Sequence, residues 1–479
     1  MLKDLILFGT GEKGKKLSAL LEHYEVGIQY WLDSDSTKWN KLLDGKKIYP
    51  PCKIRDEDDA KICISATDTE EEMYHAILDY GVSKERIVPF GQMIVNGVSA
   101  HYVWNKQNIF SDSPTIIFDC SKGMLLGGVE AWSKSLLKEL KKRGQRAYLL
   151  SPCGNYPIEN EIKQNMLWVD SQPKNLFSYE NIENIITALQ RKMPCVLISS
   201  FPGDMLLAAC CLKKRYPEYV RIFSVIHQGT SATCKEHVEL EPYIEKYIAV
   251  SRDIQEEMVK RGIEKDKVLH MTCPVDCIEP YVRDYTRDNK KELRIGYAGR
   301  IEVAQKRMDQ LLSLIKELEE LHTNYHMEIA GNGSYLRQLK EQIEHNDLSH
   351  KVTLLGEIKR REIASFWSKQ DVCVNLSDFE GRSISIMEAM KNGAVPVVTA
   401  TSGVKEDIIH GENGYMVDIG NYKDMAMKID YLANNRQLLS LFGNKAHEII
   451  TQKSNKDVHM NFWNKILQKT DVGGNDEMD

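Results

Sequence analysis

The chain has 479 residues, too many for one hydrophobic core, so its length predicts roughly three domains of ordinary size. Its formal net charge of −6 is small, which gives no general argument for nucleic-acid binding, so any site for an anion must be local. The longest apolar runs fall far short of a membrane-spanning helix and the first residues read as a strand and a turn, so we expect a cytoplasmic protein. The 11 cysteines are scattered without C-x2-C pairs and are expected to be reduced and mostly buried.

The first predicted unit is a small Rossmann-like domain over residues 1–97. Its apolar first strand runs into a turn with the G-x-G-x-x-G spacing of dinucleotide-binding folds, and Asp33 ends the next strand-like run. The glycines of the turn are Gly9, Gly11 and Gly14. A further strand, a helix over 70–80 and a short strand over 86–89 complete only half of a dinucleotide fold, and a polar linker over about 97–114 follows.

This short domain is not expected to bind NAD, because a dinucleotide normally spans two such halves. The glycine turn then serves as a tight connection between a strand and a helix. We expect the domain to dock on the rest of the chain, to associate with a second copy of itself as a homo-oligomer, or to recruit a partner enzyme.

A second α/β domain is predicted over residues 112–280. Gly127 and Gly128 lie between its first strand and a helix, where glycines can line an anion site with backbone N–H groups, admit a substrate, or only serve packing. The helix, residues 130–143, has apolar residues on one side and lysines elsewhere. Such a basic amphipathic helix can lie on an anionic membrane surface, although it more often covers a protein core.

His227 follows directly on an apolar strand over residues 221–226. Ligands of open α/β sheets bind at the carboxyl ends of parallel strands, so this position favours a site role over the structural role that isolated histidines more often have. A neutral imidazole there can donate a hydrogen bond to a ligand hydroxyl. A charged linker over 283–292 follows, which places a cleft between this domain and the next.

The third domain, residues 290–452, begins with an apolar strand followed by Arg300 and Lys306. Two cations placed in this way, one in a turn and one near a helix start, can bind a diphosphate together. The planar arginine guanidinium donates two parallel hydrogen bonds, and the lysine ammonium group adds a compact positive charge. The alternative is that both are ordinary surface cations. The next strand ends in a turn that contains Gly333.

Two glutamates, Glu380 and Glu388, flank the loop before a helix that is predicted over residues 384–392, with Ser383 or Ser385 as its cap. The loop residues expected near a ligand are Gly381, Arg382 and Ser383. The N-terminus of such a helix favours an anion such as a diphosphate, so the carboxylates need other partners, of which sugar and ribose hydroxyls are the natural ones. The alternative is a solvated loop glutamate followed by an exposed helix glutamate.

In their order along the chain, these features resemble glycosyltransferase family 4, whose members have the GT-B architecture. The series is a glycine loop, a strand-end histidine, Arg-x5-Lys, a G-x-G turn and E-x7-E, and it runs from about residue 115 to the last helix. The resemblance implies an α/β protein with two Rossmann-like domains facing a cleft, an acceptor domain over 112–280 and a donor domain over 290–452, preceded by the small Rossmann-like domain. A C-terminal helix within 453–470 would cross back to the acceptor domain, and residues 471–479 read as a disordered tail.

The resemblance also implies residue roles. The catalytic set is His227, Arg300, Lys306 and Glu380, and the set that binds the donor is Gly127, Gly128, Gly333, Gly381, Arg382, Ser383 and Glu388. The two cations would clamp the donor diphosphate, Glu380 would lie against the donor sugar, and Glu388 would lie against the ribose. Arg382 departs from the family, which often has a smaller residue there, so it recognises an acidic donor sugar or forms a salt bridge to Glu380.

The activity implied by the resemblance is that of a retaining glycosyltransferase, which moves a sugar from a nucleoside diphosphate sugar to a hydroxyl acceptor. The acceptor would be a glycan, a lipid-linked glycan or a protein in bacterial surface polysaccharide or glycoconjugate synthesis, with possible peripheral contact with the inner membrane surface. No cofactor and no metal are expected, because two cations and a helix N-terminus supply the charge and Asp33-Ser34-Asp35 lies in the N-terminal domain. Two alternatives are a non-catalytic GT-B partner subunit and an NAD-dependent oxidoreductase.

Overall fold

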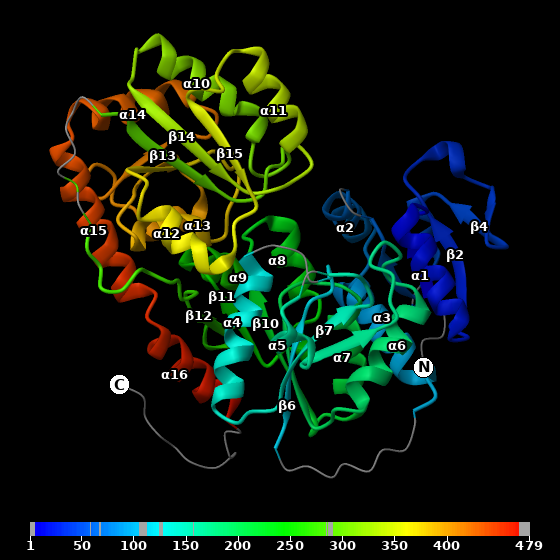
Figure 1. Ribbon diagram of the computed structural model, residues 1–479. Helices are drawn as coiled ribbons and strands as arrows, with labels where there is room; N and C mark the ends of the chain where they lie inside the picture. Colours follow the sequence, from blue (N-terminus) through cyan, green and yellow to red (C-terminus); the bar gives the residue numbers. More distant parts are fainter. Residues whose placement is uncertain are drawn as a thin grey trace.

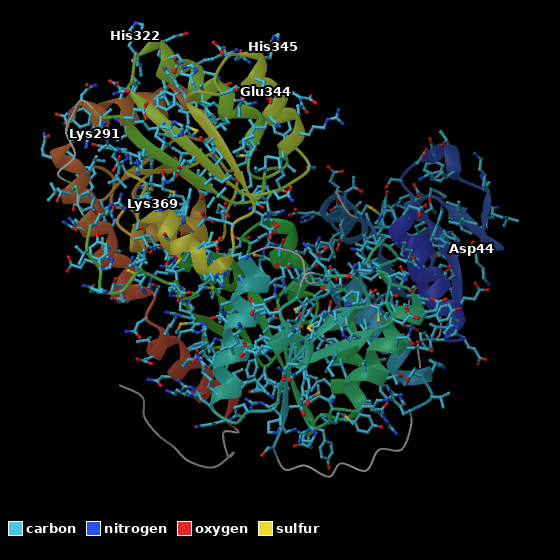
Figure 2. The ribbon with its side chains drawn as sticks, in the orientation of Figure 1. Asp44, Lys291, His322, Glu344, His345 and Lys369 are labelled. Carbon is cyan, nitrogen blue, oxygen red and sulfur yellow. The ribbon has the colours of Figure 1, made fainter. Side chains whose placement is uncertain are left out.

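A computed structural model describes residues 5–57, 59–66, 69–104, 113–123, 128–156, 158–283, 285 and 291–468, without the side chains at 231 and 232. Within these residues three sheets follow one another along the chain, each built mainly of parallel strands and covered by helices (Figure 1). Charged side chains such as Asp44, Glu344 and Lys369 project from the surface of these units (Figure 2). The predicted α/β class with several Rossmann-like units is confirmed.

The N-terminal sheet has the strand order β3-β4-β2-β1-β5, with β3 antiparallel to β4 and the others parallel. Its elements are β1 Leu5–Phe8, α1 Glu12–His23, β2 Ile28–Leu32, β3 Leu42–Leu43, β4 Lys46–Tyr49, β5 Lys61–Ile64, α2 Glu70–Asp79 and α3 Phe90–His101, with 3-10 turns at Ser36–Lys38, Pro51–Asp56 and Lys84–Arg86. The strand predicted over 86–89 is wrong. The chain makes a single bridge there, between Ile62 and Ile87, before Pro89, which lacks an N–H donor, leads into α3.

The helix α3 attaches the N-terminal unit to the rest of the chain. Its side chains Phe90, Met93 and Val98 are buried in one apolar core with residues of the second unit, including Cys210 and Cys211. The predicted linker start at 97 therefore falls inside a helix that two units share. Of the three expectations for this domain, docking within the chain is the one that the structure describes.

The second sheet is wholly parallel, in the order β12-β11-β10-β9-β6-β7-β8. Its elements are β6 Thr115–Asp119, α4 Gly128–Lys142, β7 Ala147–Pro152, α5 Asn160–Lys163, β8 Met166–Val169, α6 Tyr179–Gln190, β9 Cys195–Ser199, α7 Asp204–Arg215, β10 Val220–Ile226, α8 Ser231–Val238, β11 Lys246–Ala249, α9 Arg252–Lys260 and β12 Val268–His270, with 3-10 turns at Glu241–Tyr243 and Lys265–Lys267. The basic helix α4 buries Trp132, Leu136 and Leu140 in the core, and Lys138 pairs with Glu159 at 2.8 Å. Its apolar side thus covers the protein interior, which is the alternative to a membrane surface.

The third sheet is also parallel, in the order β15-β14-β13-β16-β17-β18. Its elements are β13 Leu293–Ala298, α10 Leu311–Glu320, β14 Tyr325–Ala330, α11 Leu336–His345, β15 Val352–Gly356, α12 Ile363–Trp367, β16 Val372–Asn375, α13 Ile384–Lys391, β17 Val395–Thr399, β18 Tyr415–Val417, α14 Tyr422–Asn434 and α15 Gln437–Lys453, with 3-10 turns at Met308–Gln310, Arg360–Glu362 and Ser402–Glu406. The left-handed Gly393, with φ of 77°, ends α13 where the sequence places the end of that helix.

The last helix, α16 Lys456–Leu467, returns from the third unit to the second (Figure 1). Met460 and Trp463 are buried in the core of the second unit. At the end of the helix, the Arg221 guanidinium donates to the backbone carbonyls of Ile466 at 2.8 Å and Leu467 at 3.0 Å. These bonds satisfy carbonyl groups that a helix end otherwise leaves unpaired. Among the helices that the structure describes, none has the length and apolar content needed to cross a membrane.

Both larger sheets reverse their strand order once, between β6 and β9 in the second unit and between β13 and β16 in the third. Ligands in open α/β sheets bind outside the carboxyl ends of the strands at such a reversal. In Figure 1 the third unit (yellow-green to orange) lies above the second (cyan and green), with α13 facing α4 and α9. The fold therefore predicts a site between these two units.

Candidate active site

A cavity of about 330 Å³ lies between the second and third units. The second unit contributes Gly128 and His227 to its lining, and the third contributes Arg300, Lys306, Glu380, Arg382, Ser383 and Glu388. Of the other residues predicted for the site, Gly333 and Gly381 do not line this cavity, and Gly127 lies outside the described residues. Residues that are some 160 positions apart in the sequence thus meet at one place, because both strand-order reversals face it.

Lys306 forms an ion pair with Glu380 inside the cavity. Their side chains are only 13% and 9% exposed, and Glu380 also accepts a hydrogen bond from the Ser377 hydroxyl at 2.8 Å. The cation and the carboxylate that were predicted to hold different parts of a ligand therefore pair with each other in this structure. A charge-assisted bond of this kind is strong, so an anion that binds Lys306 must compete with Glu380.

Gln305 is a residue of this site that the sequence did not single out. Its amide Nε2 donates to the carbonyl of Phe379 at 2.9 Å, and its Oε1 accepts from Arg300 Nη2 at 2.6 Å. Arg300 also pairs with Glu302 at 2.8 Å, and its side chain remains 48% exposed. Gln305 therefore ties the Arg300 turn to the loop that carries Glu380, and Arg300 is the more accessible of the two cations.

Close backbone contacts explain why two of the predicted positions, Gly333 and Gly381, take glycine. A Cβ atom added to Gly381 would lie 1.9 Å from the carbonyl oxygen of His227, and one added to Gly333 would lie 2.2 Å from the carbonyl oxygen of Ile301. Only glycine permits so close an approach of two backbones. Gly381 therefore lets the loop of the third unit touch the His227 strand end of the second, and Gly333 lets its turn approach the Ile301 backbone within the third unit. The predicted contacts of both glycines with a donor stay predictions.

Arg382 pairs with Asp407 and Glu406 rather than with Glu380. Its guanidinium makes a bidentate pair with Asp407, with Nε and Nη2 at 2.9 and 2.6 Å from the two carboxylate oxygens, and Nη1 lies 3.6 Å from Glu406. The Arg382 side chain is 3% exposed. Its charge is matched within the protein, so the predicted salt bridge to Glu380 is wrong, and Arg382 is not placed as a free cation for an acidic sugar.

Glu388 is buried one helical turn into α13 and pairs with Arg360. Burial raises the pKa of Glu388 to about 7, an effect that the Arg360 charge opposes. Arg360 also lies 4.0 Å from Asp276, which in turn pairs with Lys456 at 2.6 Å. Arg360 lines the cavity, and no sequence pattern pointed to it.

The start of α13 faces the cavity through Ser383, Ile384 and Ser385. The prediction that a serine caps this helix is wrong, because the Ser383 side chain makes no capping bond and the Ser385 hydroxyl donates to the carbonyl of Ala298 at 2.6 Å. The first N–H groups of a helix have no partner within the helix. Without a side-chain cap, they and the positive end of the helix dipole favour an anion at this place.

His227 stands at the end of β10, on the side of the second unit. Its Nε2 lies 3.2 Å from the Ser200 hydroxyl, and its ring meets the Trp132 indole edge to face at a centroid distance of 5.2 Å. Desolvation lowers the pKa of His227 to about 4, so the imidazole is neutral near pH 7. It can exchange a hydrogen bond with a ligand hydroxyl without adding a charge to the cavity.

The glycine turn of the N-terminal unit has its polar groups engaged locally. Asp33, where a dinucleotide fold would hold a ribose, accepts from Thr10 N at 3.0 Å, Asp35 N at 2.9 Å and Lys38 Nζ at 3.1 Å. A Cβ atom added to Gly14 would lie 2.1 Å from the Gly9 carbonyl oxygen. These contacts are those of a tight strand-to-helix connection. In the described residues no group of three or more His, Cys, Asp and Glu side chains is arranged to hold a metal ion.

Two family models match separate parts of the chain. Residues 282–449 match the family described as Glycosyl transferases group 1, and residues 1–88 match the family described as C2185-like, N-terminal. An uncharacterized glycosyltransferase of Haemophilus influenzae is 22% identical over 333 residues, which covers 67% of this chain and 90% of that protein. The poly(ribitol-phosphate) alpha-N-acetylglucosaminyltransferase of Staphylococcus aureus is 30% identical over 173 residues, 35% of this chain. This chain spans 34% of the staphylococcal protein and 40% of an uncharacterized glycosyltransferase of Methanocaldococcus jannaschii that it also matches.

Among solved structures, that of Anabaena Alr3699/HepE in complex with UDP and glucose is similar with a TM-score of 0.60 and 16% identity, over 74% of this chain and 99% of that one. The fold of the second and third units is thus that of the GT-B glycosyltransferases. More particularly, the part of the chain that matches Glycosyl transferases group 1 is the third unit, and the C2185-like match falls on the N-terminal unit. Membership of glycosyltransferase family 4 stays a prediction.

Proposed function

We propose that the protein is a retaining glycosyltransferase that transfers a sugar from a nucleoside diphosphate sugar to a hydroxyl group of a glycan, lipid-linked or protein acceptor. The observation that carries the proposal is the convergence of Lys306, Arg300, Glu380, Glu388 and a neutral His227 on one cavity between two Rossmann-like units. The names of the relatives support bacterial surface polysaccharide or glycoconjugate synthesis as the setting.

The donor diphosphate occupies the positive part of the cavity in this proposal. Lys306, Arg300 and the uncapped N-terminus of α13 face it from the third unit. Phosphate oxygens displace Glu380 from Lys306, which frees the carboxylate to accept hydrogen bonds from sugar hydroxyls. Binding of the diphosphate thus prepares the sugar contact, and the same cations stabilise the charge of the departing diphosphate.

We propose that the donor configuration is retained, and the positions of the carboxylates support this part of the proposal. Glu357, Glu380 and Glu388 are the carboxylates among the described residues that line the cavity, and all three belong to the third unit, which also holds the leaving group. A double displacement needs a nucleophile on the opposite face of the sugar. In the proposed reaction the leaving phosphate oxygen instead takes the proton from the acceptor hydroxyl as that hydroxyl attacks on the same face, and His227 orients a hydroxyl group nearby.

Cations of the protein supply the charge that a metal would supply in this mechanism, so we propose that neither a metal nor another cofactor is required. We also propose a cytoplasmic location. Peripheral membrane contact and association of copies through the N-terminal unit remain predictions. The apolar side of α4 is buried, so this helix offers no free apolar face in support of membrane contact.

The test is incubation of the full-length protein with a panel of nucleoside diphosphate sugars, with release of the diphosphate and binding of UDP and GDP measured in parallel. The proposal expects binding of one nucleotide and slow hydrolysis of at least one of its sugars. A protein that binds glycan but neither nucleotide, and hydrolyses no donor, would instead be a non-catalytic partner subunit.

A further inference from the structure

His459 of the C-terminal helix α16 accepts two buried hydrogen bonds at one nitrogen. The indole Nε1 of Trp132, on α4, lies 3.3 Å from His459 Nε2, and the indole Nε1 of Trp463 lies 3.1 Å from the same atom. The three residues are at most 5% exposed. An indole N–H can only donate, so His459 Nε2 is the acceptor and the ring proton lies on Nδ1. Burial lowers the pKa of His459 to about 4, which keeps this neutral form near pH 7.

Trp132 extends this arrangement to the cavity. Its ring lies edge to face against His227, with centroids 5.2 Å apart and planes at 67°. The Ser200 hydroxyl, 3.2 Å from His227 Nε2, holds the other side of the imidazole. Trp463 contacts Trp132, His459 and Phe462, and no ring contact with His227 is found among the described residues. His227 therefore has two neighbours that fix it, and one of them is fixed in turn by α16.

We propose that His459 is a positioning residue for His227. The acceptor nitrogen of His459 holds the Trp132 indole, and this indole packs against the His227 imidazole. The inference rests on the proposed function, because it concerns a side chain assigned to the reacting sugar. It gives the return of α16 a role beyond joining the units. The helix α16 follows the third unit in the chain, and through His459 and Trp132 it supports the part of the cavity that the second unit contributes.

The reasoning predicts a specific defect when the acceptor is removed. Two buried N–H groups would then lack a partner, which favours rotation of the indoles or entry of water. A shift of a reacting group by about 1 Å costs roughly a hundredfold in rate, and a smaller shift of His227 should cost roughly tenfold. Donor binding should not change, because Arg300 and Lys306 are not among the residues that line the small cavity beside Trp132 and His459.

The test compares His459→Phe, which keeps a ring but removes the acceptor, with His459→Gln, whose amide oxygen can accept both bonds. We expect His459→Phe to lower kcat roughly tenfold with an unchanged donor KM and UDP affinity, and His459→Gln to restore kcat to within about twofold. Trp463→Phe is the matched control, since it removes the other indole donor without touching His227. It should lower the melting temperature and leave kcat within about twofold.

A folded His459→Phe variant with normal kcat overturns the proposal, and so does an equal loss of kcat in Trp463→Phe, which would mean that helix docking alone matters. If His459→Phe does not fold, Trp132→Phe removes the same donor and must lower kcat at unchanged UDP affinity. One readout is independent of turnover: the nitrogen NMR shifts of His459 in the full-length protein must show a proton on Nδ1. A proton on Nε2 contradicts the inference, whereas absence of any transfer by the wild-type protein contradicts the proposed function.

Discussion

Replacing Lys306 by alanine is the sharpest perturbation of the proposed phosphate site. In the structure Lys306 pairs with Glu380, and both side chains are nearly buried. In the donor complex, the proposed mechanism moves the ammonium group to the diphosphate. The variant therefore removes the pair with Glu380 from the free protein and the contact with the diphosphate from the donor complex. The first loss is measured as a change in the free energy of unfolding, and the second as a change in turnover.

The size of each loss follows from the surroundings. A preorganised donor to a developing charge is worth roughly 2.7–4 kcal/mol, so turnover should fall by about 10² to 10³. Without Lys306, Glu380 keeps the Ser377 hydroxyl at 2.8 Å and the Gln305 amide at 3.4 Å, so we expect a loss of about 1–3 kcal/mol in the free energy of unfolding. Arg300→Ala should cost less in turnover than Lys306→Ala, because its side chain is 48% exposed and water can partly replace it.

The assay is release of nucleoside diphosphate from the donor that the wild-type protein turns over, with a urea titration for stability. Arg307→Ala is the matched control: this neighbour pairs with Asp309 and Asp378 and does not line the cavity. It should leave turnover within about threefold, as expected for a partly exposed ion pair away from the chemistry. A folded Lys306→Ala variant with turnover close to wild type would refute the assignment of the diphosphate to this cation.

Three further predictions concern other parts of the chain. Glu388→Gln should weaken UDP or GDP binding in calorimetry, and a variant with unchanged nucleotide affinity would disprove the ribose contact. The variant should also stabilise the fold at pH 8, because the Glu388 carboxyl group, with a pKa of about 7, binds its proton more tightly in the folded protein. The wild-type protein therefore loses up to roughly 3 kcal/mol of stability as the pH rises from about 4.5 to 7. Saturating NAD or NADP should not raise the melting temperature, and a clear rise that Gly11→Val abolishes would show a second nucleotide site. Deletion of residues up to 97 should yield insoluble protein, because the cut exposes the apolar core that α3 shares with α7. A soluble product that unfolds cooperatively would show that the N-terminal and second units fold independently.

Sequence patterns singled out charged residues that line the cavity because each pattern is local. Arg-x5-Lys and E-x7-E each lie within one strand-to-helix connection, and His227 lies at a strand end that the apolar run before it marks. The parallel strands themselves are short apolar runs, which are typical of strands buried on both faces. These features could be predicted without knowing how the chain is packed.

The contacts that the sequence did not predict join residues far apart in the chain. Arg360 reaches Glu388, Arg382 reaches Asp407, and the two pairs are set by the packing of α13 against its neighbours. Gly381 carries the usual signal for close backbone approach, but nothing in the sequence says that the approaching group is the carbonyl of His227. Such pairings depend on tertiary structure.

The role of α3 was missed for a different reason. Most of this helix is apolar, including Met93 and Val98, so it has more than the single apolar stripe of a surface helix. A helix that is apolar on several sides is buried between two bodies. Read in that way, the segment would have predicted a shared core rather than the start of a polar linker at 97.

The measurement that tests the central claim most directly is NMR of the product formed by the full-length protein from its nucleoside diphosphate sugar in the presence of EDTA. The proposed mechanism predicts that transfer continues without a divalent metal and that the new linkage keeps the anomeric configuration of the donor. A product of inverted configuration, or a loss of activity with EDTA that magnesium restores, would contradict the assignment of leaving-group stabilisation to Arg300, Lys306 and the start of α13.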